Sequence, residues 1–196
     1  MTKAIRIHEQ GGTDVMKWED VDVGDPAAGE IRVRHTAVGL NFIDCYHRSG
    51  LYPLTNFPET LGMEGAGVVE AVGDGVTELS VGQRIAYAQP MGSYCEARVM
   101  PAERAIALPD AIDDQTAAAM MLQGTTAEYL IGRTYPVQAG DTVLFHAAAG
   151  GVGLIACQWL KHIGATVIGT VGSDEKAELA KANGCDHPIL YREENV

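Results

Sequence analysis

The sequence lacks the features of a chain that spans a membrane, is secreted or binds nucleic acid. Its apolar runs are short and interrupted, whereas a bilayer-spanning helix needs about 20 apolar residues. The first residues, Met1–His8, alternate like a strand and have no signal-peptide core. Only 14 residues are basic against 26 acidic ones, which gives a net charge of −12. Because phosphate backbones and anionic membranes attract basic patches, we expect a cytoplasmic protein that contacts neither membrane nor nucleic acid.

Cysteine is also scarce, with four residues in a chain of 196. They are Cys45, Cys95, Cys157 and Cys185. None of them has the C-x-x-C spacing of a zinc or redox motif, so we interpret them as reduced thiols in a cytoplasmic chain. The chain also lacks internal repeats and low-complexity segments, and its length allows one or two domains.

The N-terminal part is predicted to be rich in β-strands. Short segments of alternating or apolar residues are separated by Gly, Pro and Asp turns over residues 1 to about 110. The predicted strands cover residues 4–8, 15–23, 30–38, 65–73, 81–88 and 92–100. Strands of this length and spacing are typical of a compact, barrel-like domain.

The hydrophobic period changes near Asp113. Residues Asp113–Gln123 predict a helix with an acidic start, and Thr125–Tyr135 predict a second helix. We therefore place the domain boundary at about residue 123, with one domain over residues 1–123 and another over residues 124–196.

The strongest signal is a strand, a glycine turn and a helix that follow one another from Thr142. The apolar run breaks at Gly150, Gly151 and Gly153, and apolar residues then recur at helical spacing up to Gly164. Glycines let the backbone approach a pyrophosphate, and the amides of the helix N-terminus face the anion. Ala148 stands where the full fingerprint has its first glycine, so an ordinary glycine-rich turn is the alternative.

The residues after this helix repeat the pattern. Thr166–Val171 predict a second buried strand, Asp174–Asn183 a short helix, and Pro188–Tyr191 the start of a third strand. The order β-α-β-α-β is one mononucleotide-binding half of a doubly wound sheet. The predicted fold class is therefore α/β, with a β-rich domain followed by half of a Rossmann domain.

Four motifs distributed over most of the chain carry a family resemblance. They are Gly39–Pro53, Gly62–Val69, Gln123–Ala127 and Ala147–Gly153. Together they resemble the medium-chain dehydrogenase/reductase superfamily, and within it the branch of zinc-independent NADPH:quinone oxidoreductases. The resemblance implies a GroES-like domain followed by a Rossmann domain, with hydride or electron transfer from NADPH to a small quinone or enone. It also implies a homodimer of the full-length parent.

The sequence departs from the zinc enzymes of this superfamily at both metal sites. Asn41 stands where they carry a cysteine ligand, and Met63 where they carry a histidine. Zinc favours thiolate, imidazole or carboxylate ligands, and Glu64 alone cannot hold it. The segment between Gln83 and Gly92 is too short for a four-cysteine structural lobe. We therefore expect no metal, and we interpret Cys45 as a small side chain that is buried or lines the cleft.

The choice of nicotinamide cofactor depends on the end of the second Rossmann strand. An acidic residue there binds the ribose hydroxyls of NAD, but this chain has Val171. The absence of the acid, with Ser173 and Lys176 nearby, allows a 2′-phosphate and favours NADPH. By resemblance, the loop from Gly172 to Lys176 and Tyr191 contact that phosphate. The alternatives are a solvated lysine and a tyrosine that packs at a strand end.

The resemblance also implies the residues of the site. Those at the reacting end are Asn41, Asp44, Tyr46 and Tyr52. Those that contact the cofactor are Phe42, Ile43, Asp44, Cys45, Tyr46, Thr126, Gly150, Gly151, Val152, Gly153, Gly172, Ser173, Lys176 and Tyr191. The residues from Asn41 to Tyr46 are expected to line the cleft near the nicotinamide. The alternative for Tyr46 and Tyr52 is that they only pack a loop surface.

Three functions remain open from the sequence. The first is NADPH-dependent reduction of quinones without zinc. The second is reduction of enones or enoyl thioesters by the same fold, and the third is nucleotide binding without turnover by a truncated paralogue. Because members of the family extend much further than residue 196, we expect this chain to be a fragment that alone binds the cofactor only in part.

Overall fold

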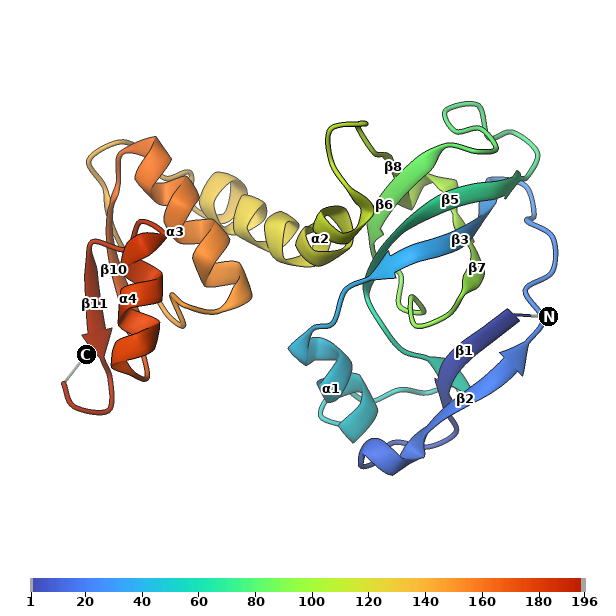
Figure 1. Cartoon of the computed structure of the whole chain (residues 1–196), viewed down its shortest axis with the longest axis horizontal. Coiled ribbons are helices and arrows are strands. Elements are labelled where there is room, and N and C mark those ends of the chain that lie inside the picture. Colours follow the sequence, from blue (N-terminus) through green and yellow to red (C-terminus); the bar gives the residue numbers. More distant parts are fainter. Residues whose placement is uncertain (1, 195–196) are drawn as a thin grey trace. The chain divides into compact units, whose positions relative to one another are not determined.

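The structure, a computed structural model, describes residues 2–194. It consists of two compact units that divide between Leu122 and Gln123. The first is built of antiparallel strands and the second of parallel strands with helices, so the predicted fold class is confirmed (Figure 1). No helix within residues 2–194 is long and apolar enough to cross a membrane.

The first unit contains two antiparallel sheets. The larger has the strand order β7-β3-β5-β6-β8 and the smaller the order β2-β1-β4. The strands of the larger sheet are β3 (Glu30–Val38), β5 (Glu64–Val72), β6 (Arg84–Ala88), β7 (Ala97–Pro101) and β8 (Ile106–Ala107). Those of the smaller sheet are β1 (Thr2–Ile7), β2 (Met16–Val21) and β4 (Glu59–Thr60). Short 3-10 turns lie at η1 (Thr13–Val15) and η2 (Ala102–Arg104).

Alternation along the strands creates the core of this unit. On β3 the side chains of Ile31 and Val33 are fully buried, and their neighbours in sequence are more exposed. They pack with Val69 of β5 and with Ile85 and Tyr87 of β6. This is the inward–outward pattern that a half-buried strand predicts.

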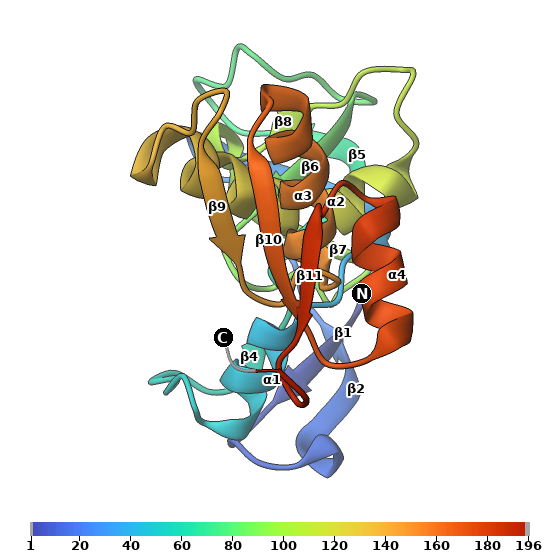
Figure 2. The same cartoon turned by 90° about the vertical axis from the view of Figure 1, so that its left-hand side faces the viewer.

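The second unit is a three-stranded parallel sheet with two crossover helices. Its strands are β9 (Thr142–Phe145), β10 (Thr166–Val171) and β11 (His187–Leu190), in the order β11-β10-β9 (Figure 2). The helices α3 (Gly151–Ile163) and α4 (Asp174–Ala182) lie on the same face of this sheet (Figure 1). Their buried side chains form one core with β10. The sheet is the predicted first half of a Rossmann domain.

The two helices predicted before this sheet are one. Helix α2 runs from Asp114 to Glu128 and continues as the π-helix η3 (Tyr129–Thr134). A glycine inside a helix costs about 1 kcal/mol. Helix α2 nevertheless continues through Gly124, because it has buried alanines on both sides of this glycine. Ala118 packs in the first unit and Ala127 in the second.

Helix α1 (Phe42–Ser49) was not predicted. Its signals are Asn41 and Asp44, which form a capping box at its start, and Gly50, which ends it in a left-handed conformation. Two predicted strands also begin later than expected, at Arg84 and Ala97. The residues before β7 bond elsewhere, since the Tyr94 carbonyl accepts from the Ile5 amide at 2.7 Å.

Candidate functional site

A buried carboxylate fixes the start of α1. Asp44 is 4% exposed, and its Oδ2 accepts hydrogen bonds from the Asn41 amide at 2.8 Å and from the Tyr94 hydroxyl at 2.7 Å. Its Oδ1 is buried without a hydrogen-bond partner among residues 2–194. Burial, followed by the hydrogen bond to Asp44, raises the pKa of Tyr94 above its usual range. Asp44 therefore ties α1 to the loop before β7.

A second buried carboxylate, Glu64, ties three segments together. Its Oε1 accepts from Asn41 Nδ2 at 2.6 Å, and its Oε2 accepts from the Leu122 amide at 2.7 Å. Glu64 is 1% exposed, and burial raises its pKa although both hydrogen bonds act in the opposite direction. The start of β5, the cap of α1 and helix α2 thus meet at one side chain.

An exposed aromatic pair follows along α1. The rings of Tyr46 and Tyr52 meet edge to face with centroids 5.4 Å apart, and both are partly open to solvent. Phe42 and Cys45 are also exposed, and Ile43 is half-buried. Of the two places expected for Cys45, a buried one is therefore wrong, and a place that lines the cleft stays a prediction. The structure brings the predicted residues of this segment onto one short helix and the turn after it.

The residues at the expected metal positions do not fit zinc. The amide nitrogen of Asn41 donates to Glu64, and Met63 is a buried thioether. Within residues 2–194, no group of three or more His, Cys, Asp and Glu side chains could hold a metal ion. An amide and a thioether replace the thiolate and imidazole that zinc prefers.

The glycine turn of the second unit is held by β10. The Ala147 amide donates to Thr170 Oγ1 at 3.3 Å, and the Ala148 amide donates to the Thr170 carbonyl at 3.1 Å. Ala147 itself has a φ of 54°, which is unusual for a residue with a side chain. Thr170 is a residue that the sequence analysis missed, because its partners are over 20 positions away.

Close packing at the start of α3 explains its glycines. A Cβ at Gly153 would overlap the Ala147 carbonyl and would lie 2.7 Å from the backbone carbon of Ala148. The helix begins at the N-cap Gly150, which has no side chain to cap it, and no acid lies in its first turn. Such a glycine-rich helix N-terminus, whose backbone a ligand can approach closely, fits the pyrophosphate of a dinucleotide.

The residues predicted to contact a 2′-phosphate gather at the end of β10. A Cβ at Gly172 would lie 2.7 Å from the Tyr191 hydroxyl, so this ring covers the turn. Ser173 is the N-cap of α4, and its hydroxyl accepts from the Lys176 amide at 3.4 Å. The side chain of Lys176 is exposed. Thr126 and Val152 are half-buried on α2 and α3.

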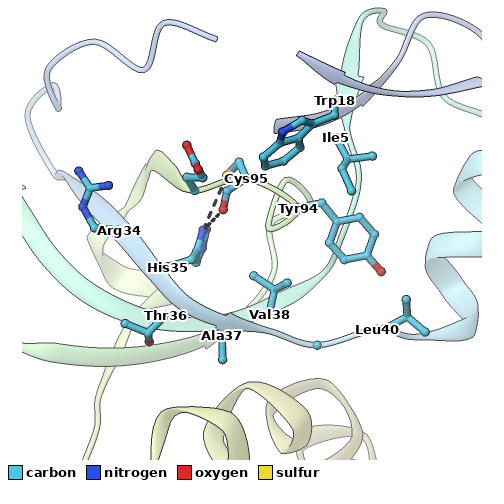
Figure 3. A pocket seen from close by; sticks show the side chains of 12 residues that line it. Ile5, Trp18, Arg34, His35, Thr36, Ala37, Val38, Leu40, Tyr94 and Cys95 are labelled. Carbon is cyan, nitrogen blue, oxygen red and sulfur yellow. Dashed lines mark hydrogen bonds between the residues drawn. The ribbon is translucent and has the colours of Figure 1, made fainter. Parts of the chain in front are cut away.

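A pocket of about 610 Å³ in the first unit was not predicted. Figure 3 shows Trp18, Val38, Leu40 and Tyr94 around it, with His35 at its wall. None of the predicted site residues lines it. Tyr94 connects this pocket to helix α1, because its hydroxyl donates a hydrogen bond to Asp44.

His35 is held as a neutral ring. A carbonyl oxygen can only accept, so Nδ1 carries the proton and donates to the Cys95 carbonyl at 2.7 Å (Figure 3). Nε2 then accepts from the Tyr87 hydroxyl at 2.6 Å. Burial lowers the pKa of His35 from 6.5 to about 4; the hydrogen bond to the Cys95 carbonyl opposes this in part, and the charge of Arg98 adds a smaller lowering effect.

We expect the protein to lose stability between pH 6.5 and pH 4 because of His35. Between these pH values the unfolded chain binds a proton at His35 and the folded chain does not. The contribution of His35 to the free energy of unfolding is therefore present above pH 6.5 and is lost as pH falls to about 4. The free energy of unfolding that is lost over this whole range is about 3 kcal/mol. Urea unfolding of wild type and H35N at several pH values measures it as the difference between the two curves, which removes the opposite effect of Glu64. Parallel curves would contradict the assignment.

Comparisons with known proteins agree with this architecture. Residues 27–138 match the alcohol dehydrogenase GroES-like domain, and residues 151–196 match the zinc-binding dehydrogenase family. A quinone oxidoreductase of Pseudomonas aeruginosa is 52% identical over 100% of this chain and 61% of its own length. A 2-haloacrylate reductase of Burkholderia is 49% identical over 97% of this chain and 59% of its own. The chain thus spans about 60% of the length of these relatives.

Solved structures give the same result. The quinone oxidoreductase of Pseudomonas syringae superposes with a TM-score of 0.97 at 50% identity, over 100% of this chain and 61% of that one. The Escherichia coli quinone oxidoreductase complexed with NADPH has a TM-score of 0.95 at 47% identity, over 98% of this chain and 60% of that one. A GroES-like domain joined to a dinucleotide-binding half defines the class of alcohol dehydrogenase-like proteins. The chain belongs to the medium-chain dehydrogenase/reductase superfamily, which confirms the resemblance carried by its four motifs.

Proposed function

We propose that the protein is an NADPH-dependent reductase of quinones that works without zinc. The observation that supports this best is the superposition on a quinone oxidoreductase complexed with NADPH, with a TM-score of 0.95 over 98% of the chain. The glycine turn at α3, with no acid in the first turn of the helix, agrees with it. Asn41 and Met63, which do not fit zinc, support the metal-free part of the proposal.

The cofactor when bound supplies the hydride. In our proposal, Gly150, Gly151, Val152 and Gly153 hold its pyrophosphate through the start of α3. Gly172, Ser173, Lys176 and Tyr191 surround the 2′-phosphate, and Thr126 with the residues Phe42–Tyr46 contacts the nicotinamide end. Asp44 acts by holding α1 in place, because its Oδ2 is occupied by Asn41 and Tyr94.

The exposed pair Tyr46 and Tyr52 suits a flat, aromatic acceptor. Offset or edge-to-face contacts with such rings are favourable, and each tyrosine carries a hydroxyl for an acceptor oxygen. Reduction of a quinone consumes one hydride and one proton to give the hydroquinone. Tyrosine hydroxyls and water supply that proton at a site where no acid–base dyad is required. A cytoplasmic location and a homodimer are also part of this proposal.

The test is an activity comparison on the full-length protein. NADPH oxidation is followed with 1,4-benzoquinone, 2-chloroacrylate and crotonyl-CoA, with and without EDTA. The proposal predicts the highest kcat/KM for the quinone and no effect of the chelator. A loss of activity with EDTA that zinc restores would contradict the zinc-free reaction.

Reduction of an activated alkene is the second candidate. It is favoured by the 2-haloacrylate reductase at 49% identity and by the structure of a 2-haloacrylate reductase with a TM-score of 0.87. A kcat/KM for 2-chloroacrylate or crotonyl-CoA above that for the quinone would support it. Tight NADPH binding without reduction of any acceptor would instead support the third candidate, a nucleotide-binding protein without turnover.

We expect K176A to weaken NADPH binding about 5- to 10-fold and to leave NADH binding unchanged. An exposed lysine near a phosphate contributes on the order of 1 kcal/mol through charge, and only NADPH carries the 2′-phosphate. Fluorescence titration with each cofactor measures the two dissociation constants. The matched control is K181A on the same helix, where the lysine pairs with Glu178 at 2.9 Å. If K176A loses equal affinity for NADPH and for NADH, the assignment of Lys176 to the 2′-phosphate is wrong.

A further inference from the structure

The glycine turn has a neighbour that belongs to another helix. A Cβ at Gly151, the first residue of α3, would lie 2.5 Å from Cδ and 2.6 Å from Nε2 of Gln123, and closer still to Oε1. The side-chain amide of Gln123, which lies on α2, therefore occupies the space that any other residue at position 151 would need. Both residues belong to the second unit.

The position of this amide has a chemical meaning. The amides at the start of α3 form an anion site, and the Nε2 of Gln123 places an N–H donor group beside them. The first turn of α3 contains no acidic residue. In a chain with a net charge of −12, a neutral donor at this place strengthens anion binding without adding a negative charge.

We propose that Gln123 is a further cofactor-binding residue, whose side-chain amide donates a hydrogen bond to the pyrophosphate held at the start of α3. This assignment rests on the proposed NADPH-dependent function and adds a residue from α2 to its site. Gly151 then has two purposes. It lets the cofactor approach the protein backbone, and it makes room for the Gln123 amide.

The competing explanation is that Gln123 only packs against the turn. Packing depends on the shape of a side chain, whereas contact with a pyrophosphate depends on the sign of its charge. Variants of opposite charge at this position therefore separate the two roles.

The experiment measures dissociation constants of the full-length wild type, Q123A, Q123E and Q123K for NADPH and for ADP-ribose, by calorimetry. ADP-ribose contains the pyrophosphate and lacks the nicotinamide. We expect Q123E to bind both ligands at least about 10-fold more weakly, Q123A a few-fold more weakly, and Q123K as tightly as wild type or more tightly. Q115E, an exposed glutamine on the same helix, is the matched control and keeps wild-type affinity.

Thermal unfolding without ligand accompanies each titration, so that a variant that fails to fold is recognised; Q123A and Q123K then carry the comparison. Equal weakening by Q123E and Q123K overturns the assignment in favour of packing. An effect on NADPH but not on ADP-ribose overturns it as well, because the contact is then not with the pyrophosphate. If the wild type binds NADPH and all three variants bind it equally well, the assignment of Gln123 is overturned and the proposed function stays intact. If the wild type binds neither NADPH nor ADP-ribose, both the assignment and the proposed function are overturned.

Discussion

Replacement of Gly153 by alanine lowers NADPH affinity at least about 100-fold and the free energy of unfolding by about 3 kcal/mol. The added methyl group meets backbone, not a flexible side chain: it overlaps the Ala147 carbonyl and lies 2.7 Å from the Ala148 carbon and oxygen. Relief requires α3 to move away from the end of β9, which opens the turn that holds the pyrophosphate. Calorimetric titration and urea unfolding measure the two effects.

The matched control is G132A in the π-helix η3. Its new Cβ has one neighbour at ordinary contact distance, Glu128 Oε1 at 3.7 Å, and its backbone needs no positive φ. We expect unchanged NADPH affinity and a change in stability within about 1 kcal/mol. An NADPH affinity of G153A close to that of wild type would show that the turn tolerates a side chain and would refute its role.

The substitution E64Q destabilises the protein by about 2 kcal/mol and lowers kcat/KM of the full-length enzyme. The substituted side chain keeps one acceptor for the Leu122 amide, but its new NH2 group then faces the NH2 group of Asn41, so two donors meet in a buried place. Asn41 cannot turn its amide without disturbing the capping box that it shares with Asp44. Urea unfolding and steady-state kinetics give the two values.

The double substitution N41D/E64Q restores the match. The amide introduced at position 64 then donates to the carboxylate introduced at position 41 and accepts from the Leu122 amide, so donor faces acceptor at both contacts. We expect the double variant to recover to within about 1 kcal/mol of wild type, with a coupling energy of about 2 kcal/mol or more between the two positions. If the losses of the single variants simply add, the hydrogen bond between Asn41 and Glu64 is not what holds α1 and α2 together.

Features that depend on neighbours in sequence were predicted well. The apolar run from Thr142, the glycines after it and the strand at 166–171 give a strand–turn–helix–strand order that the structure confirms. The cap residues of α1 were present in the sequence as well, but its mixture of aromatic, cysteine and histidine residues has weak helix propensity, and the segment was interpreted as a loop.

Features that depend on distant residues could not be predicted in this way. Tyr94 reaches Asp44 across 50 positions, and Glu64 reaches Leu122 across 58. Gln123 covers Gly151 only because α2 and α3 pack in the second unit. Such partners have no local period or spacing, so the sequence indicated the glycine turn without the side chains that complete it.

The division between Leu122 and Gln123 falls inside a continuous helix, and this bears on how the protein can be dissected. Helices gain stability cooperatively along their length, so a cut at the boundary would fray the last turns of one piece and remove the leading turns of the other. A severed first unit would lose the hydrogen-bonded turn that presents the Leu122 amide to Glu64. For separate expression, or for exchange of modules between relatives, α2 therefore has to stay whole, because Ala118 and the Leu122 amide are bound within the first unit and Ala127 packs in the core of the second.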